Sequence, residues 1–396
     1  MSAVSTASAI TPRRSAERAA GVAATTVRER IVDALPPDLN GDWSDLAARA
    51  SEPNAFAEPW FVAPSLAHLR DEAVRLVEVR THSRLTGIIM LGVERRYGRV
   101  PVAHVQNWRH HHLFLGAPLV AAGEEEAFWQ ALLQHLDESR WAPNFLHVHG
   151  LVEGGPVLDG LQAASNDRGC ALVHREVRAA LESDLSPTAY YEATVRKKKR
   201  KELARLRNRL AELGTLATRE LVPEDDLTPW SDAYLRLEQS GWKGKEGSAL
   251  ACRPETEAFF RNTLGAARAA GRLQLLALEL DGRPIAMLVN FLTPPGSFSF
   301  KTTFDEDYAR FSPGVLLQID NLAILDRPDI AWMDSCAAES HPMIDSLWAE
   351  RRAVVRVTIP LRGVRRRLAH GAARGLETLS AALRRPRQPP AQGEEA

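Results

Sequence analysis

Two stretches, EQSGWKGKEGSAL at residues 238–250 and FSFKTTFDEDYARFSPGVLL at residues 298–317, say most about the fold of this chain. The second runs from an alternating strand into an apolar helix that is expected to begin at Pro313. Ser312 is a good N-cap, Pro suits the first helical position, and Gly314 lets a ligand approach the backbone. Such a turn can bind a phosphate on free N–H groups at the positive end of the helix dipole. A capped helix start without a ligand is the alternative for this tripeptide taken alone.

The residues around these stretches alternate between strand and helix patterns. The turn Asp281-Gly282 separates two apolar runs, Leu273–Leu280 and Pro284–Leu292, which is a strong hairpin signal. Pro53 and Pro59 are expected to break the chain. Further strands are expected at Val74–Arg80, Arg84–Val93, Pro101–Val105, Asn144–His149, Ser297–Thr303, Ile330–Met333 and Val354–Ile359. Helices are expected at Trp43–Ala50, Glu124–Asp137, Thr194–Leu213, Pro229–Gln239, Pro254–Ala270 and Pro313–Leu325. This alternation indicates the α/β (α+β) fold class.

The bulk composition is that of an ordinary globular protein. A chain of 396 residues suggests two domains, and 50 Lys+Arg against 50 Asp+Glu predict no partner from net charge. The widely spaced Cys170, Cys252 and Cys336 argue against a disulfide framework and fit a reducing cytoplasm. No apolar run approaches the ~18 residues that a membrane span needs. We therefore expect a cytoplasmic protein without a transmembrane segment.

Charge is unevenly distributed along the chain. Residues 1–30 carry few large apolar groups, so a disordered arm is expected there. Residues 196–209 hold nine Lys/Arg against one Glu, in a helix that could bind RNA, an acidic acyl carrier protein or a membrane surface. A solvated helix face is the alternative. Residues 362–387 hold eight Arg against one Glu and could lie on an anionic membrane, as a peripheral contact, or be disordered.

Two pairs of side chains are candidate site residues: one pair precedes the turn at Ser312, and the other lies in the Gly-rich loop at residues 238–250. Lys301 lies in the alternating strand and Asp305 just beyond it; a Lys could hold a carboxylate or phosphate, and an Asp could accept a proton. Trp242 and Lys243 lie in a Gly-rich loop, where they could line a substrate pocket. Ordinary surface charges and a loop-anchoring Trp are the alternatives.

A second group follows the short strand near residue 330. His341 could act as a general base with Asp334 orienting it, whereas Cys336 is more simply read as a buried thiol than as a nucleophile. The histidine run His110–His112 invites a metal-site interpretation. Adjacent residues rarely point at one ion, so no metal site is expected.

In order, these segments form a pattern: a basic helix, then SGWKG, ELDGRPIA and FKTTFDEDYARFSPGVLL. Over about residues 190–350 the pattern resembles the GNAT-superfamily acyltransferases of the CelD/BcsL group, the cellulose-biosynthesis-type acetyltransferases, which are related to the FemAB aminoacyl transferases. The resemblance implies tandem GNAT-like domains, each a mixed, mostly antiparallel sheet flanked by helices. It places them at residues 31–185 and 186–360, between the disordered arm and an Arg-rich, partly disordered tail at residues 361–396.

The resemblance also implies a donor site. Ser297–Thr303 would be the splayed strand whose backbone N–H stabilises the oxyanion, and Arg310, Ser312 and Gly314 would bind the pyrophosphate of acetyl-CoA or another acyl-CoA. The usual GNAT loop is only partly present, with Pro313 between Arg310 and Gly314. An acyl carrier protein or an aminoacyl-tRNA is therefore an alternative donor.

For the reaction, the resemblance implies direct transfer from the thioester to an amine on a small molecule or sugar, in polysaccharide or lipid biosynthesis. His341 or Asp305 would deprotonate the amine, Lys301 would hold an acidic group of the substrate, and Trp242 would line the pocket. Two other functions stay open: a FemAB-like transferase that uses aminoacyl-tRNA, and a binding protein that kept the fold without turnover.

Overall fold

The structure, a computed structural model, describes residues 25–384, and its strands join in one 13-stranded mixed sheet. The strand order is β1-β2-β3-β4-β6-β13-β7-β12-β11-β10-β9-β8, and β5 pairs with β3. The strands are β1 (Thr25–Val32), β2 (Val74–Thr81), β3 (Arg84–Glu94), β4 (His104–Asn107), β5 (Leu119–Val120), β6 (Phe145–Val152), β7 (Ala171–Leu181), β8 (Leu216–Glu220), β9 (Leu273–Leu280), β10 (Arg283–Thr293), β11 (Gly296–Phe304), β12 (Trp332–Asp334) and β13 (Glu350–Pro360).

Eleven α-helices flank the sheet in the part of the chain that the structure describes. They are α1 (Asn40–Ala48), α2 (Pro59–Leu69), α3 (Glu125–Glu138), α4 (Pro156–Ser165), α5 (Pro187–Thr194), α6 (Lys197–Ala211), α7 (Leu227–Ser240), α8 (Trp242–Lys245), α9 (Pro254–Ala269), α10 (Pro313–Asp320) and α11 (Val364–Arg384). The short 3-10 helices η5 (Glu306–Phe311) and η6 (Asn321–Asp326) border α10. We call residues 25–165 the N-terminal half and residues 187–334 the C-terminal half.

Local sequence explains the C-terminal half well. The predicted hairpin forms between β9 and β10, and both Asp281 and Gly282 take the positive φ that a tight turn requires. Alternate residues of these strands face opposite sides of the sheet. Leu276 and Leu278 pack with α6 and α10 on one side, whereas Leu275 joins the core with α7 and α9 on the other.

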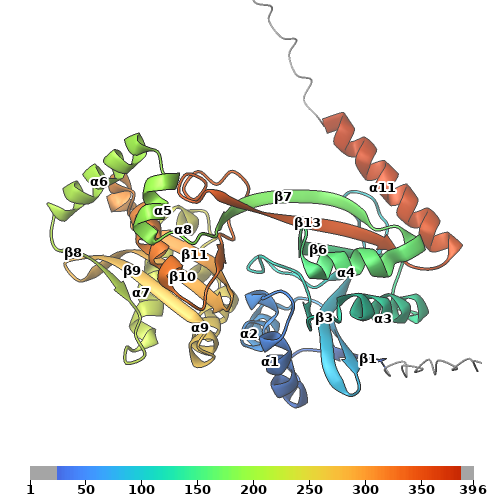
Figure 1. The fold of residues 1–396 in the computed structure, drawn as a ribbon. Coiled ribbons are helices and arrows are strands. Elements are labelled where there is room, and N and C mark those ends of the chain that lie inside the picture. Colours follow the sequence, from blue (N-terminus) through green and yellow to red (C-terminus); the bar gives the residue numbers. More distant parts are fainter. Residues whose placement is uncertain (1–24, 385–396) are drawn as a thin grey trace, which may run out of the picture.

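The two halves share strands and a core. β13 follows the C-terminal half in sequence but lies between β6 and β7, antiparallel to both, and β7 continues across to pair with β12. Figure 1 shows this β7–β13 ribbon spanning the two lobes. An aromatic cluster also crosses between the halves: the rings of Phe56 and Phe298 are 5.2 Å apart, and those of Phe61 and Phe259 are 5.7 Å apart.

Several expectations differ from the structure. Residues 25–30, expected in a disordered arm, form most of β1, because they pair in register with β2; residues 1–24 lie outside the described part. Pro59 does not break the chain but begins α2, where its missing N–H costs nothing. The Arg-rich tail forms α11 as far as residue 384, and residues 385–396 lie outside the described part. The strand expected at 354–359 belongs to β13 and pairs with β6 of the N-terminal half, although the predicted domain boundaries assign it to the second domain. The domain division itself stays a prediction.

Candidate active site

Two parallel strands of the C-terminal half separate after a short region of pairing. β11 and β12 pair at only three positions, the last joining Phe298 to Asp334. Beyond it, β11 continues along β10 while the chain after β12 turns away. The register between β10 and β11 skips Phe300, which is therefore the extra residue of a β-bulge. The bulge belongs to the β10–β11 ladder, and beyond Phe298 the edge of β11 that faced β12 has no partner strand in the described chain, so backbone polar groups become available at this opening.

The helix α10 begins beside the same opening. Ser312 adopts the left-handed conformation (φ 53°, ψ 51°) and Pro313 starts the helix, as the sequence predicts. The buried Gln318 donates from Nε2 to the hydroxyl oxygens of Ser299 and Thr302, both at 3.3 Å, which holds α10 on β11. Pro313 has no N–H, and the N–H groups of Val315 and Leu316 both donate to the Ser312 carbonyl, at 2.9 and 3.1 Å. Within the described residues the Gly314 N–H is therefore the donor of this turn that stays available to an anion at the positive end of the helix.

A basic groove of about 670 Å³ lies between α6 and the start of α10. Its lining includes Lys199, Arg205 and Arg209 from α6 and Arg310 and Ser312 from the turn before α10. This volume is within the range of small-molecule sites. The structure therefore brings two of the three predicted phosphate-binding residues to one groove. It adds α6 cations whose place in the groove the sequence could not show.

The third predicted residue, Gly314, does not line this groove. A Cβ at Gly314 would lie 3.4 Å from both the Met343 methyl group and the Phe304 ring. The loop between β12 and β13 therefore packs on the start of α10, and it also reaches α6, where Lys199 donates to the Ser346 hydroxyl. His341 belongs to this loop. No hydrogen bond joins His341 to Asp334 anywhere in residues 25–384, so the predicted orienting contact is not formed.

Lys301 lies directly after the bulge residue. Its ammonium group is 5.2 Å from the centre of the Phe300 ring and 5.7 Å from that of Phe114, and within the described residues it has no ion-pair partner. Burial, and then the nearby charge of Lys243, lower the pKa of Lys301 from 10.5 to about 8. An amine with such a pKa can exchange a proton near neutral pH.

Burial also keeps the neighbouring histidines and the thiol uncharged. It is the largest cause that lowers the pKa of His110 to about 3 and that of His112 to about 2, with the charge of Lys301 as a further cause. Burial and the adjacent Asp334 raise the pKa of the Cys336 thiol well above its ordinary value. A thiol that stays protonated is a poor nucleophile. Lys301 is thus the most readily titrated of these four groups near neutral pH.

A cleft of about 770 Å³ opens between the two halves and leads from this cluster. His112, Phe114 and Cys336 line its inner part, close to Lys301. Arg109 and Arg356 line it further along, and neither forms an ion pair among the described residues.

Arg109 and Arg356 are near enough that the charge of Arg356, after burial, lowers the pKa of Arg109. Arg109 Nη1 lies 2.8 Å from His149 Nδ1, and His149 Nε2 lies 3.2 Å from Gln106 Oε1. This arrangement is consistent when His149 accepts from Arg109 and donates to Gln106. Asp71, Glu72, Glu94 and Glu176 also line the cleft, but none of them forms an ion pair with Arg109 or Arg356.

The remaining predicted residues have evident structural partners. Asp334 is fully buried and accepts from Arg178 Nη2 at 2.7 Å. Asp305 accepts from Arg283 Nη2 at 2.8 Å and caps η5 by accepting from the Asp307 N–H.

Trp242 and Lys243 lie on α8. The Trp242 side chain is 53% exposed, and Lys243 donates to the buried Glu238 at 2.9 Å. Both line a small recess beside Thr302 and Thr303 on β11. Their assignment as substrate-binding residues, like the catalytic assignments of Asp305, Asp334 and His341, stays a prediction.

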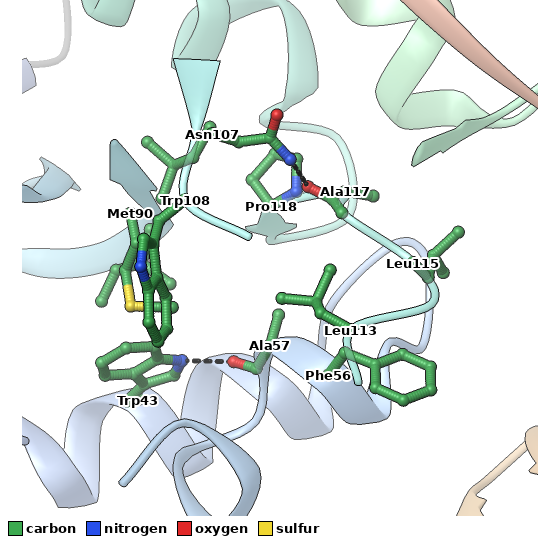
Figure 2. Close-up of a pocket in the computed structure, with 13 residues that line it drawn as sticks. Trp43, Phe56, Ala57, Met90, Asn107, Trp108, Leu113, Leu115, Ala117 and Pro118 are labelled. Carbon is green, nitrogen blue, oxygen red and sulfur yellow. Dashed lines mark hydrogen bonds between the residues drawn. The ribbon is translucent and has the colours of Figure 1, made fainter. Parts of the chain in front are cut away.

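A small cavity, shown in Figure 2, lies within the N-terminal half. It measures about 30 Å³ and is lined largely by apolar groups, including Trp43, Phe56 and Trp108. Trp43 Nε1 closes one side by donating to the Ala57 carbonyl at 2.9 Å. This volume admits about one water molecule, so we do not regard it as a substrate site.

Comparisons with known proteins agree with this geometry. Residues 197–342 match the family model described as "Acetyltransferase (GNAT) domain". No curated protein matches the chain. Among solved structures, FemX aligns with a TM-score of 0.55 at 10% identity, covering 84% of this chain and 96% of that one. A protein of unknown function from Bacteroides thetaiotaomicron aligns with a TM-score of 0.56 at 10% identity, covering 85% and 100%.

The C-terminal domain of a putative lysylphosphatidylglycerol synthetase from Agrobacterium fabrum is also similar, with a TM-score of 0.50 at 16% identity, covering 86% and 96%. At such low identities these likenesses show the fold alone. Together with the family match, they confirm the predicted fold class, a mixed α/β structure with a large mixed sheet flanked by helices. Residues 197–342 are thus similar to a GNAT acetyltransferase domain, which supports transferase activity.

Proposed function

We propose that the protein is a cytoplasmic N-acyltransferase of the CelD/BcsL type that transfers an acyl group from acyl-CoA to an amine. One observation carries the proposal: strands β11 and β12 splay next to a bulge at Phe300, with Lys301 on one side and the start of α10 on the other. A thioester carbonyl in the opening would meet backbone N–H donors, and its phosphates would meet a helix N-terminus and a basic groove.

In this reaction the amine nitrogen forms a bond to the thioester carbon, and the carbon–sulfur bond breaks. Neutral Lys301 accepts the proton that the amine loses and returns it to the departing thiolate. Its pKa of about 8 suits both steps, because an ordinary thiol titrates at about 8.5. Lys301 takes this role in place of Asp305, which the structure engages with Arg283 and the η5 cap.

The acceptor would enter through the cleft between the halves. Its amine would reach Lys301 along the wall formed by Phe114 and Cys336, while Arg109 and Arg356 hold an acidic group at the other end. A phosphate or carboxylate is the natural partner for two arginines without a carboxylate of their own. We therefore propose an amine that also carries an anionic group.

The donor site is tested by thermal unfolding with CoA, acetyl-CoA and a long-chain acyl-CoA at moderate salt. A ligand that binds only the folded protein raises the melting temperature. Arg205→Gln combined with Arg209→Gln removes two cations from the groove. Lys198→Gln combined with Lys201→Gln removes two cations of the same helix that do not line it. We expect the shift to persist in the second double variant and to fall strongly in the first. Equal shifts in both, or none in the wild type, would refute the donor groove.

Aminoacyl-tRNA is a second candidate donor, because nine basic residues are concentrated at positions 196–209. A polyanion of that size would contact the exposed cations of α6 outside the groove as well as inside it. Affinity for tRNA should then fall steeply with salt, and both double variants should weaken it alike. Binding of tRNA with that pattern, without any shift by CoA, would replace the acyl-CoA proposal.

A further inference from the structure

The C-terminal helix α11 presents an apolar stripe to solvent. Val364, Leu368, Leu376 and Leu379 are 75%, 70%, 52% and 62% exposed, and we call them the α11 stripe. They recur at intervals of four, eight and three residues, so they lie along one side of the helix. Only ten large hydrophobic residues are exposed in the described part of the chain, and these four belong to one helix. Such a concentration marks an interaction surface.

The opposite side of α11 is fixed to the protein. His370 is buried and its Nε2 lies 2.9 Å from the Thr358 hydroxyl on β13. Ala373 is fully buried in a small core with Tyr97 and Phe145. Arg366 donates to the Ala142 carbonyl at 2.9 Å, near the end of α3. Figure 1 shows α11 beyond the ends of β7 and β13, away from the C-terminal half. The stripe therefore faces outward on a rigidly held helix.

Unpaired positive charge lies on α11 and on a neighbouring loop. Glu377, the acidic residue of α11, faces the protein, because a Cβ at Gly98 would lie 2.6 Å from its carboxylate. This contact places the loop that joins β3 to β4 beside the helix. Exposed arginines that form no ion pair with any carboxylate in the described chain occur on both elements: Arg365, Arg367 and Arg374 on α11, and Arg95, Arg96 and Arg99 on the loop.

We propose that α11 is a docking helix that lies on an anionic lipid surface, with its stripe among the acyl chains and its arginines at the headgroups. An amphipathic basic helix binds such a surface through apolar burial and attraction to anionic lipids together. A second copy of the chain is a poorer occupant, since pairing two stripes would bring arginines of like charge together. No described helix is long and apolar enough to cross a bilayer.

The test is flotation of the full-length protein with vesicles. One set contains phosphatidylcholine alone and the other an equal mixture of phosphatidylcholine and phosphatidylglycerol. Leu368→Gln with Leu376→Gln removes half of the stripe, and Arg365→Gln, Arg367→Gln and Arg374→Gln together remove the helix charges. These side chains are exposed, so the variants should fold. Leu172→Gln with Leu185→Gln, at two exposed leucines elsewhere, is the matched control.

We expect the wild type and the control to float with the anionic vesicles and not with phosphatidylcholine alone. Each arginine near an anionic surface raises the vesicle–water partition coefficient about fivefold, so the partition coefficient of the triple variant should fall roughly a hundredfold. The stripe variant should lose binding even at low salt. The proposal is overturned if the wild type does not float with anionic vesicles, or if the stripe variant floats as well as the control. It is also overturned if the stripe variant abolishes a dimer seen by size exclusion without vesicles. None of these outcomes affects the proposed donor groove.

Discussion

Replacing Lys301 by Met should stabilise the folded protein while it abolishes acyl transfer. Burial lowers the pKa of Lys301 from 10.5 to about 8. One pKa unit corresponds to about 1.4 kcal/mol, so the protonated amine costs the folded state about 3 kcal/mol at pH 7. Methionine has a similar shape, fits beside the rings of Phe114 and Phe300, and carries no charge to desolvate. We expect the free energy of unfolding at pH 7 to rise by about 2–3 kcal/mol, measured by urea titration.

The pH dependence supplies the sharper part of this test. Between about pH 8 and 10.5 the unfolded chain holds a proton on Lys301 that the folded chain has lost, so wild-type stability should rise with pH in this window. The difference in the free energy of unfolding between the wild type and Lys301→Met should therefore be largest below pH 8 and vanish by about pH 10.5. In the wild type, kcat/KM should rise through about pH 8 as the amine becomes a base.

Lys243→Met is the matched control. Lys243 carries the same charge nearby but donates to the buried Glu238 at 2.9 Å. Its loss leaves that carboxylate unpaired, so this variant should be destabilised by about 1–3 kcal/mol, the opposite sign. If Lys301→Met destabilises the protein at pH 7, or if its gap to the wild type does not change with pH, Lys301 is not a desolvated amine and the proposed proton transfer loses its basis.

Further substitutions test two carboxylates near the site and the packing of the N-terminal half. Asp334→Asn leaves buried arginines without a charged partner, so urea midpoints should show a loss of about 3–5 kcal/mol; a neutral result would contradict the buried ion pair. Asp305→Ala removes a helix cap, and we expect a loss of about 1 kcal/mol with kcat retained; lost turnover at unchanged stability would instead make Asp305 the base. Gly87→Ala places a methyl group 2.1 Å from the Phe128 ring. This overpacking should lower the free energy of unfolding by about 1–3 kcal/mol, which a lower melting temperature would report. Gly92→Ala, which meets open space, should melt like the wild type.

The sequence predicted the elements whose cause is local. The Asp281-Gly282 hairpin, the start of α10 at Pro313 and the helix expected at Glu124–Asp137, which is α3, all depend on residues within a few positions of one another, and all formed as expected. β1 was missed because TTVRERIV is an exposed, charged edge strand, and only its pairing with β2 distinguishes it from a disordered arm. β7 was also missed, because its pairing partners β12 and β13 lie more than 150 residues away in the sequence.

The candidate site was predictable to a similar degree. The turn at Ser312 could be proposed as a phosphate site because turn chemistry is local, whereas Arg310 came from the resemblance to GNAT enzymes. Phosphate binding by either residue stays a prediction. The bulge at Phe300 has no sequence signal, since neither Gly nor an unusual residue marks it. The proximity of His110 and His112 to Lys301 could not be predicted either, because it arises only across the boundary between the halves. Nothing in the sequence placed Arg109 opposite Arg356.

The shared strands connect the donor opening to the acceptor cleft. Asp334 ends β12, where the strands splay, and accepts from Arg178 on β7, while Arg352 on β13 lies 3.7 Å away. Arg178 also donates to the carbonyl of Phe114, whose ring lies beside Lys301. One buried arginine thus fixes the end of the splayed strand and a wall of the cleft together. Because β7 and β13 cross between the halves, neither half can form this arrangement alone, and the proposed transfer site is a property of the whole sheet rather than of the residues 197–342 that match the family model.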